Sequence, residues 1–186
     1  MPEVEWTTVE DGIALLTIDR PERRNALDGH VLGALHRAVD EIAGTRDIKV
    51  VVLTGNGPGF CAGADMKGNR STLADLAGTP TGELAAAATG VTTRTFLAQE
   101  LMAGLFEKIH RMRQPVIAAI RGAAHGGGFA LALASDVRIA GRSATFGAVF
   151  IERGVSACDM GTSYFLPRLV GASRAAELML TGRVFD

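Results

Sequence analysis

Three consecutive glycines follow an apolar segment and could do chemistry through their backbone. The run His125-Gly126-Gly127-Gly128 comes after residues 115–120, which have the composition of a buried strand. If a helix begins at these glycines, its first N–H groups have no acceptor within the helix and no β-carbon covers them. A second apolar segment, 49–54, precedes the loop Phe60-Cys-Ala-Gly-Ala-Asp-Met-Lys67. Two such loops could place two N–H groups around one oxygen atom, which is the geometry of an oxyanion hole.

The elements that must position these loops alternate between strands and helices. This order predicts an α/β fold with mostly parallel strands and right-handed crossovers. Asn25 is expected to cap the first helix and Ser173 the last. Residues 68–93, rich in Gly, Ala and Thr, are expected to form a mobile, partly helical excursion over a site. Strands are predicted at 12–18, 49–54, 115–120 and 136–140, and helices at 25–44, 94–113, 126–135, 160–170 and 173–181.

Composition narrows the class of protein. The chain is 47% hydrophobic and 21% charged, which indicates a globular protein, and one domain over 1–186 is expected because no repeat or linker divides it. A net charge of −1 gives no reason to expect nucleic acid or an anionic membrane as partner. The two cysteines have no metal or disulfide spacing, and neither a signal peptide nor a membrane-spanning run is present. We therefore expect a soluble cytoplasmic protein without a metal site.

The glycine clusters also have alternative interpretations. Gly55-Asn-Gly-Pro-Gly59 lacks the glycine spacing of a dinucleotide-binding turn, and Pro58 opposes immediate entry into a helix. The run 126–128 lacks the lysine and hydroxyl residue of a phosphate-binding loop. Either cluster alone could simply allow close packing of a helix on a strand.

In combination, the motifs resemble those of the crotonase, or enoyl-CoA hydratase/isomerase, family over nearly the whole chain. This resemblance implies a ClpP/crotonase-like spiral of ββα units. Members of that family usually continue beyond the segment 180–182 with further helices that close the acyl pocket and build trimers. The last residue here is Asp186, so we expect a domain that is C-terminally short relative to the family. The resemblance also implies a homotrimer or hexamer. The motifs are Asn25-Ala-Leu27, Leu53-Thr-Gly55, Phe60-Cys-Ala-Gly-Ala-Asp-Met-Lys67, Pro115-Val-Ile-Ala-Ala-Ile120, Gly122-Ala-Ala-His-Gly-Gly-Gly128, Ala132-Leu-Ala-Ser-Asp136, Ala144-Thr-Phe-Gly147, Gly161-Thr162, Leu166-Pro-Arg-Leu-Val-Gly171 and Glu177-Leu-Met-Leu-Thr-Gly182.

The resemblance also implies a site. The backbone N–H groups of Ala64 and Gly127 would polarise the carbonyl of an acyl-CoA thioester and stabilise an enolate-like oxygen. Coenzyme A would arrive as part of the substrate, with no permanently bound cofactor. Arg23 and Arg24 are candidate partners for its phosphates, although a solvated basic turn explains them equally well. The residues expected along the CoA moiety are Ala62, Ala64, Asp65, Met66, Lys67 and Gly127.

The chain departs from the family where proton transfer is concerned. Hydratases of this family hold a water molecule between two glutamates, and the corresponding positions here are Ala130 and Phe150, which cannot move a proton. Asp159 matches a position where dienoyl-CoA isomerases of the family carry a catalytic aspartate, so it is the favoured proton carrier. Its alternative roles are to cap the helix at 160–170 or to pair with Arg168.

Four other side chains that could react are less favoured as catalytic groups. Glu152 on a strand would share a face with Phe150, although a bulge or a register change could turn it away, and a surface or supporting role is expected for it. His125 is expected to pack under the glycine loop rather than donate to substrate. Cys61 and Cys158 are expected to be packing residues rather than nucleophiles. The leading function is hydration or double-bond isomerisation of an enoyl-CoA; the alternative is a non-catalytic CoA-ester binding or assembly protein.

Overall fold

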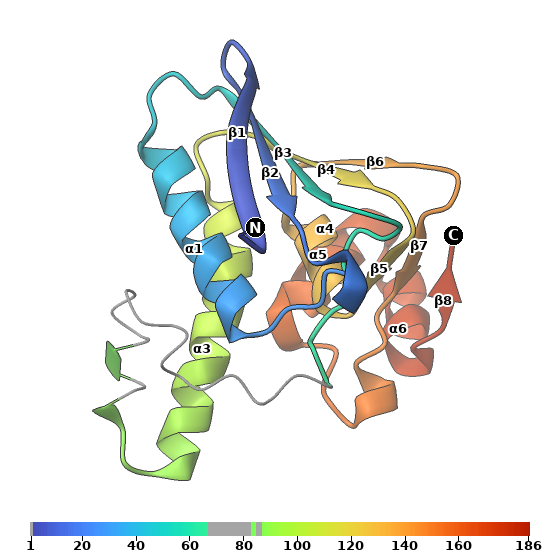
Figure 1. Cartoon of the computed structure of the whole chain (residues 1–186). Coiled ribbons are helices and arrows are strands. Elements are labelled where there is room, and N and C mark those ends of the chain that lie inside the picture. Colours follow the sequence, from blue (N-terminus) through green and yellow to red (C-terminus); the bar gives the residue numbers. More distant parts are fainter. Residues whose placement is uncertain (1, 67–82, 85–86) are drawn as a thin grey trace.

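A computed structural model describes residues 2–66, 83–84 and 87–186 of the chain, without the side chains of Arg94, Ala98 and Asp159. It consists of a larger sheet, a smaller sheet and helices packed around them (Figure 1). Most of the excursion predicted over 68–93, and Lys67 before it, lies outside the described residues.

The larger sheet has five strands in the order β1-β2-β3-β4-β6. All neighbouring strands are parallel except β1 and β2, which are antiparallel. The four strands predicted from the sequence are present, whereas β1 was not predicted because most of its residues are exposed and polar. The strands are β1 (Val4–Glu10), β2 (Ile13–Ile18), β3 (Val50–Gly55), β4 (Val116–Ile120) and β6 (Val137–Ala140).

A second, smaller sheet was not predicted. It has the order β5-β7-β8, with β5 (Ala123–His125), β7 (Thr145–Gly147) and β8 (Val184–Phe185). Strands of two or three residues are too short to show an alternating pattern. β5 runs directly into α4 (Gly127–Ala134), whose eight residues are all buried. This sheet therefore sets where the glycine-led helix begins.

The glycine-led helix is also anchored from its side. The rings of Phe129 on α4, Phe146 on β7 and Phe185 on β8 form a cluster with centroids 5.7 to 6.0 Å apart.

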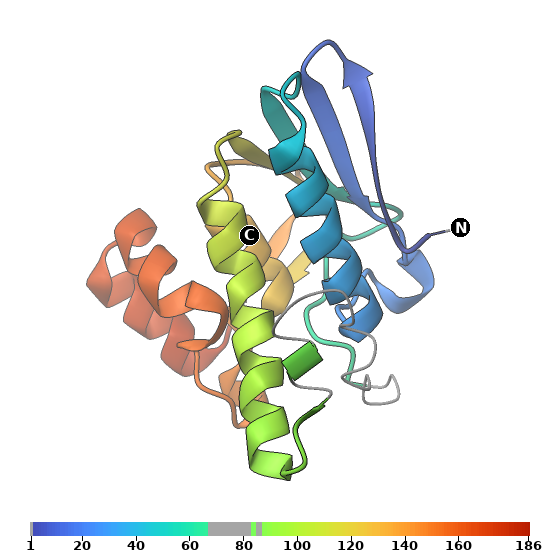
Figure 2. The same cartoon turned by 90° about the vertical axis from the view of Figure 1, so that its left-hand side faces the viewer.

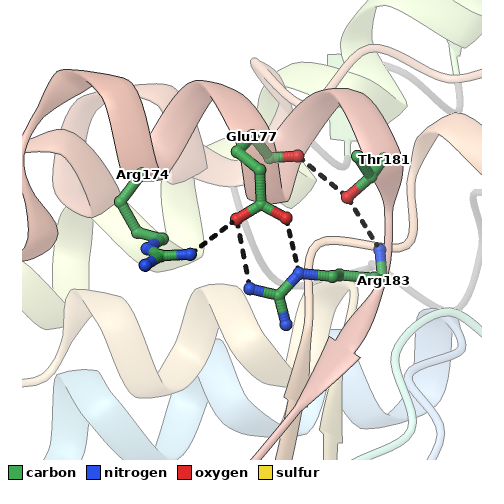
Figure 3. A network of polar contacts seen from close by, with 4 residues as sticks. All are labelled: Arg174, Glu177, Thr181 and Arg183. Atoms are coloured by element: carbon green, nitrogen blue, oxygen red, sulfur yellow. Dashed lines mark hydrogen bonds and ion pairs between the residues drawn. The ribbon is translucent and has the colours of Figure 1, made fainter.

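An ion-pair network precedes β8. Figure 3 shows the Glu177 carboxylate between Arg174 and Arg183. The hydrogen bond from Arg183 is the largest cause that lowers the pKa of Glu177.

The remaining helices are α1 (Gly29–Gly44), α3 (Val91–His110), α5 (Thr162–Val170) and α6 (Ala172–Thr181), with short 3₁₀ turns η1 (Pro21–Arg23), η3 (Ile151–Arg153) and η4 (Asp159–Gly161). α1 and α3 lie side by side, and Figure 2 shows both along their length.

Two predicted helix caps are wrong. α1 starts at Gly29 with the Asp28 carboxylate accepting from Val31 N–H at 3.0 Å, and α6 is preceded by Gly171 rather than capped by Ser173.

Asn25 has a tertiary role instead of a capping one. Its backbone is left-handed, with φ of 56°, a conformation that asparagine tolerates better than most residues. Its Oδ1 accepts from the Arg20 N–H at 2.8 Å, and its Nδ2 donates to the carbonyls of Asn56 and Gly59, both at 2.8 Å. The side chain thus ties the segment before α1 to the turn after β3.

Replacing Asn25 with alanine is expected to lower the free energy of unfolding by about 3 kcal/mol, since three hydrogen bonds at a buried position are lost. Urea unfolding monitored by circular dichroism measures this change. Asn56→Ala is the matched control, because both hydrogen bonds of that side chain, to Asp19 and from the Gly57 N–H, are exposed; its cost should stay within about 0.5 kcal/mol. Equal stabilities of the two variants would contradict the assigned role.

Candidate active site

The two glycine-containing loops come together at backbone distance. Cys61 and Ala124 form a parallel bridge, in which Cys61 N–H donates to Ala123 C=O at 2.9 Å and His125 N–H donates to Cys61 C=O at 3.0 Å. A β-carbon at Gly128 would lie 2.0 Å from the Cys61 carbonyl oxygen. Only glycine at position 128 therefore lets α4 pack against the loop 60–66.

Gly63 makes the second close approach between the loops. Its φ of +92° suits glycine, and a β-carbon there would lie 2.7 Å from the His125 carbonyl oxygen and 3.2 Å from the Gly127 nitrogen. The residue just before Ala64 thus lies beside the first residue of α4. The backbone of Ala64 and that of Gly127 are neighbours in space although 63 residues separate them in sequence.

Ala64 keeps its N–H out of the local hydrogen-bond ladder. Leu27 pairs with it as an isolated parallel bridge, in which Leu27 N–H donates to Gly63 C=O at 2.8 Å and Asp65 N–H donates to Leu27 C=O at 2.9 Å. Ala64 lies between the two residues that bond to Leu27, and in a parallel bridge this middle residue directs its own N–H away from the partner segment. Within the described part of the chain, no acceptor is recorded for the Ala64 N–H.

The N–H of Gly127 also lacks a recorded acceptor, for a different reason. It is the first residue of α4, and the first hydrogen bond of that helix runs from Ala130 N–H to Gly126 C=O at 2.9 Å. Gly126 N–H is satisfied by Gly147 C=O at 2.9 Å. The Gly127 N–H has no acceptor among the described residues, and it lies at the positive end of the helix dipole. Two N–H groups from neighbouring loops thus have no acceptor in the described part of the chain.

A cavity of about 310 Å³ opens onto these donors. It contains three of the predicted CoA-contacting residues from one loop, Ala62, Ala64 and Met66, together with Gly127. Most of the other wall is apolar, which suits an acyl chain. Phe150 was expected only as the position of a lost glutamate, and Gly126 only as part of the glycine run. The residues of the described lining to which the sequence gave no role are Gly63, Gln99, Met102, Val149, Arg153, Val155 and Met160.

Met160 brings its thioether close to Gly127. Its Sδ lies 3.2 Å from where a β-carbon on Gly127 would be, and its side chain is buried. Its backbone is left-handed, with φ of 55°, which is uncommon for a residue other than glycine. No pattern in the sequence announces such a conformation, so only the structure reveals this contact.

Ala130 and Phe150 stand where the resemblance places the two glutamates of a hydratase. Ala130 is fully buried within α4, and Phe150 lines the cavity. Glu152 is exposed and belongs to η3, so the expectation that it lies on a strand is wrong. The described lining residues include no carboxylate. Asp159 directly precedes Met160 in η4, and its side chain lies outside the described part.

Asp65 is turned into the fold rather than into the cavity. Its carboxylate is almost completely buried and lies 3.2 Å from Nη1 of Arg20, whose guanidinium also pairs with Glu3 and Asp28 at 2.9 and 2.7 Å. The Asp65 N–H is used by Leu27. The side chain therefore stabilises the loop, and its position does not favour direct contact with CoA.

Arg23 and Arg24 are exposed at the turn that adjoins the same loop. The Arg24 carbonyl accepts from Ala62 N–H at 3.0 Å, so this basic turn is joined to the cavity wall. The placement is compatible with both earlier interpretations, a phosphate contact and a solvated turn.

The side chain of His125, the last residue of β5, contacts the neighbouring strand β7. Its Nε2 lies 3.1 Å from the Thr145 Oγ1, and it is not among the residues that line the cavity. Burial lowers the pKa of His125, while the charge of Glu152 raises it to a lesser degree. A neutral, packed imidazole agrees with the sequence prediction.

The two cysteines should differ in reactivity. Burial raises the pKa of the Cys61 thiol to about 12, so almost no thiolate forms at pH 8, whereas Cys158 is exposed. We expect iodoacetamide to alkylate Cys158 in the native protein and Cys61 only after unfolding. Peptide mass spectrometry measures both sites; alkylation of native Cys61 would show that the loop 60–66 opens readily.

Comparison with known proteins gives the family. A sequence model of enoyl-CoA hydratase/isomerase matches residues 8–186. The chain belongs to this family. The match confirms the resemblance seen in the motifs, and the solved structures below confirm the crotonase-like fold.

Two relatives of the family show the extent of the similarity. The chain is 44% identical over 173 residues to a probable enoyl-CoA hydratase of Mycobacterium leprae, covering 92% of this chain and 54% of that protein. It is 37% identical over 176 residues to a probable enoyl-CoA hydratase of Rhodobacter capsulatus, covering 92% and 59%. The chain thus spans a little over half the length of these curated relatives.

Solved structures of the family superpose closely. A probable enoyl-CoA hydratase/isomerase from Mycobacterium abscessus has a TM-score of 0.85 at 40% identity, covering 99% of this chain and 64% of that one. A monofunctional enoyl-CoA isomerase from M. smegmatis has a TM-score of 0.75 at 35% identity, covering 100% and 71%. The first of these neighbours has the combined name hydratase/isomerase, and the second is named an isomerase.

Neither a metal-ligand cluster nor a membrane-spanning helix occurs in the described part of the chain. Among the described residues, no group of three or more His, Cys, Asp or Glu side chains could hold a metal ion. No helix in the same part of the chain is both long and apolar enough to cross a membrane.

Proposed function

We propose that the chain binds an acyl-CoA thioester with its carbonyl oxygen between the N–H groups of Ala64 and Gly127. The observation that supports this most is the close approach of two loops whose N–H groups have no acceptor among the described residues. Donors held in place before reaction stabilise the oxygen most when negative charge develops on it, as in an enolate. The CoA moiety would follow residues 62–67, with its phosphates near Arg23 and Arg24.

We further propose that the reaction is a double-bond shift of an enoyl-CoA rather than hydration. In the family's mode of hydration two glutamates hold the water, and Ala130 and Phe150 occupy those positions. A shift needs only one carboxyl group: it removes a proton from the α-carbon of a 3-enoyl thioester, the enolate forms, and the same group returns the proton to the γ-carbon. Asp159 is the proposed carrier, because it adjoins Met160 at the cavity.

One observation favours a second candidate, a CoA-ester binding protein without activity. The described cavity lining has no carboxylate, so catalysis depends on a side chain beyond it. Incubation with 3-hexenoyl-CoA in deuterated water, followed by chromatography and mass spectrometry, distinguishes the two. The proposal expects conversion to 2-hexenoyl-CoA, and the deuterium content of this product measures how far the carried proton exchanges with solvent. Binding of the thioester without conversion would favour the second candidate.

The setting of this function is part of the proposal. We propose a cytoplasmic homo-oligomer, a trimer or hexamer, with an acyl-CoA as its small-molecule partner, no permanent cofactor and no nucleic-acid or membrane partner. Light scattering coupled to size-exclusion chromatography tests the assembly; a monomeric mass would contradict it.

A further inference from the structure

Arg153 brings a single charge to the cavity. The other described lining residues are uncharged, and Gln99 is the only further polar side chain among them. The Arg153 side chain is exposed and has no recorded hydrogen bond or ion pair with the residues that the structure describes. Other arginines of this chain are engaged: Arg20 pairs with Asp28, and Arg183 pairs with Glu177.

The local backbone holds Arg153 next to the acyl wall. Arg153 N–H donates to Phe150 C=O at 2.9 Å, and Val155 N–H donates to the same carbonyl at 3.1 Å. Gly154 closes this turn in a left-handed conformation with φ of 67°. The turn thus groups Arg153 with Phe150 and Val155, whereas the CoA moiety is proposed to follow the separate segment 62–67.

We propose, on the basis of the function proposed above, that Arg153 recognises a carboxylate at the far end of the acyl group. The substrates would then be enoyl-CoA thioesters derived from dicarboxylic acids. A guanidinium fits a carboxylate with two parallel hydrogen bonds, and apolar neighbours such as Phe150 and Val155 reduce screening of the pair. An uncharged alkyl end placed against the same guanidinium would remove water from it without supplying an acceptor.

A phosphate of CoA has the same chemistry toward arginine, so the test must separate the two sources. Isothermal titration calorimetry of the full chain with glutaryl-CoA, pentanoyl-CoA and free CoA does this, because the two thioesters have acyl chains of equal carbon number and differ in the terminal carboxylate. We expect glutaryl-CoA to bind roughly tenfold more tightly than pentanoyl-CoA. Arg153→Gln should remove this preference, because it weakens the binding of glutaryl-CoA and takes away the guanidinium that an uncharged acyl end would desolvate. Arg142→Gln, which removes an exposed charge outside the cavity, should retain it.

Three results would overturn the assignment. Equal binding of both thioesters by the unsubstituted protein would refute acyl-carboxylate recognition while thioester binding stands. A similar loss for glutaryl-CoA, pentanoyl-CoA and free CoA in Arg153→Gln would show that the guanidinium contacts a CoA phosphate. Failure of both thioesters to bind the unsubstituted protein would refute the proposed function together with this inference.

Discussion

Replacing Gly127 with proline is expected to lower kcat for the double-bond shift by about 10² to 10³-fold, the range seen when one oxyanion donor is removed. Proline lacks the N–H that we propose as a donor. The first position of a helix accepts proline without losing a helical hydrogen bond, so α4 should persist. The loss should fall mainly on kcat, because the donor matters most when charge develops on the oxygen.

Gly127→Ala is the matched control for this variant. It keeps the N–H but adds a β-carbon 3.0 Å from Leu27 Cδ1 and 3.2 Å from Met160 Sδ, two side-chain ends that must shift slightly. The ratio of the two variants' rates therefore corrects for the added β-carbon and reports the loss of the N–H together with the ring atoms that only proline brings. Equal rates for proline and alanine at this position would mean that the donor is misassigned.

Replacing Asp159 with asparagine is expected to lower kcat by about 10² to 10⁴-fold, because the amide cannot carry a proton between the α- and γ-carbons. Binding of a saturated acyl-CoA, measured by calorimetry, should change little. Loss of turnover with retained binding would identify a proton carrier rather than a structural cap.

Glu152→Gln is the matched control for the carboxylate. Glu152 is exposed in η3 and is not part of the cavity lining, so its amide variant should retain turnover. Full activity of Asp159→Asn would refute the assignment of Asp159, and a selective loss in Glu152→Gln would move the proton carrier to that residue.

The sequence predicted the elements that bury long apolar runs. The strands at β2, β3 and β4 were recognised because each contains several consecutive apolar residues. The start of α1 was misplaced because Asn25 has the type of a cap but uses its side chain to bind Arg20, Asn56 and Gly59. The contacts that decide this lie up to 34 residues away and have no local signature.

The candidate site likewise contains residues that the sequence pointed to and residues that only the structure brings in. The glycine run 126–128 could be singled out from the sequence, whereas the close backbone approach of Gly63 is seen only in the structure. The walls of the cavity could not, since Met102, Arg153 and Met160 come from three separate segments that only the tertiary fold brings together. β5 and β7, which lead into and flank the glycine helix, are too short to be read from a pattern.

Isotope-edited infrared spectroscopy of a bound enoyl-CoA with a ¹³C-labelled thioester carbonyl tests the two-donor site most directly. Hydrogen bonds from both Ala64 and Gly127 should move the carbonyl stretch to lower frequency than in water, and Gly127→Pro should reverse part of that shift. A bound carbonyl that vibrates as it does in water, in the unsubstituted protein, would contradict the account.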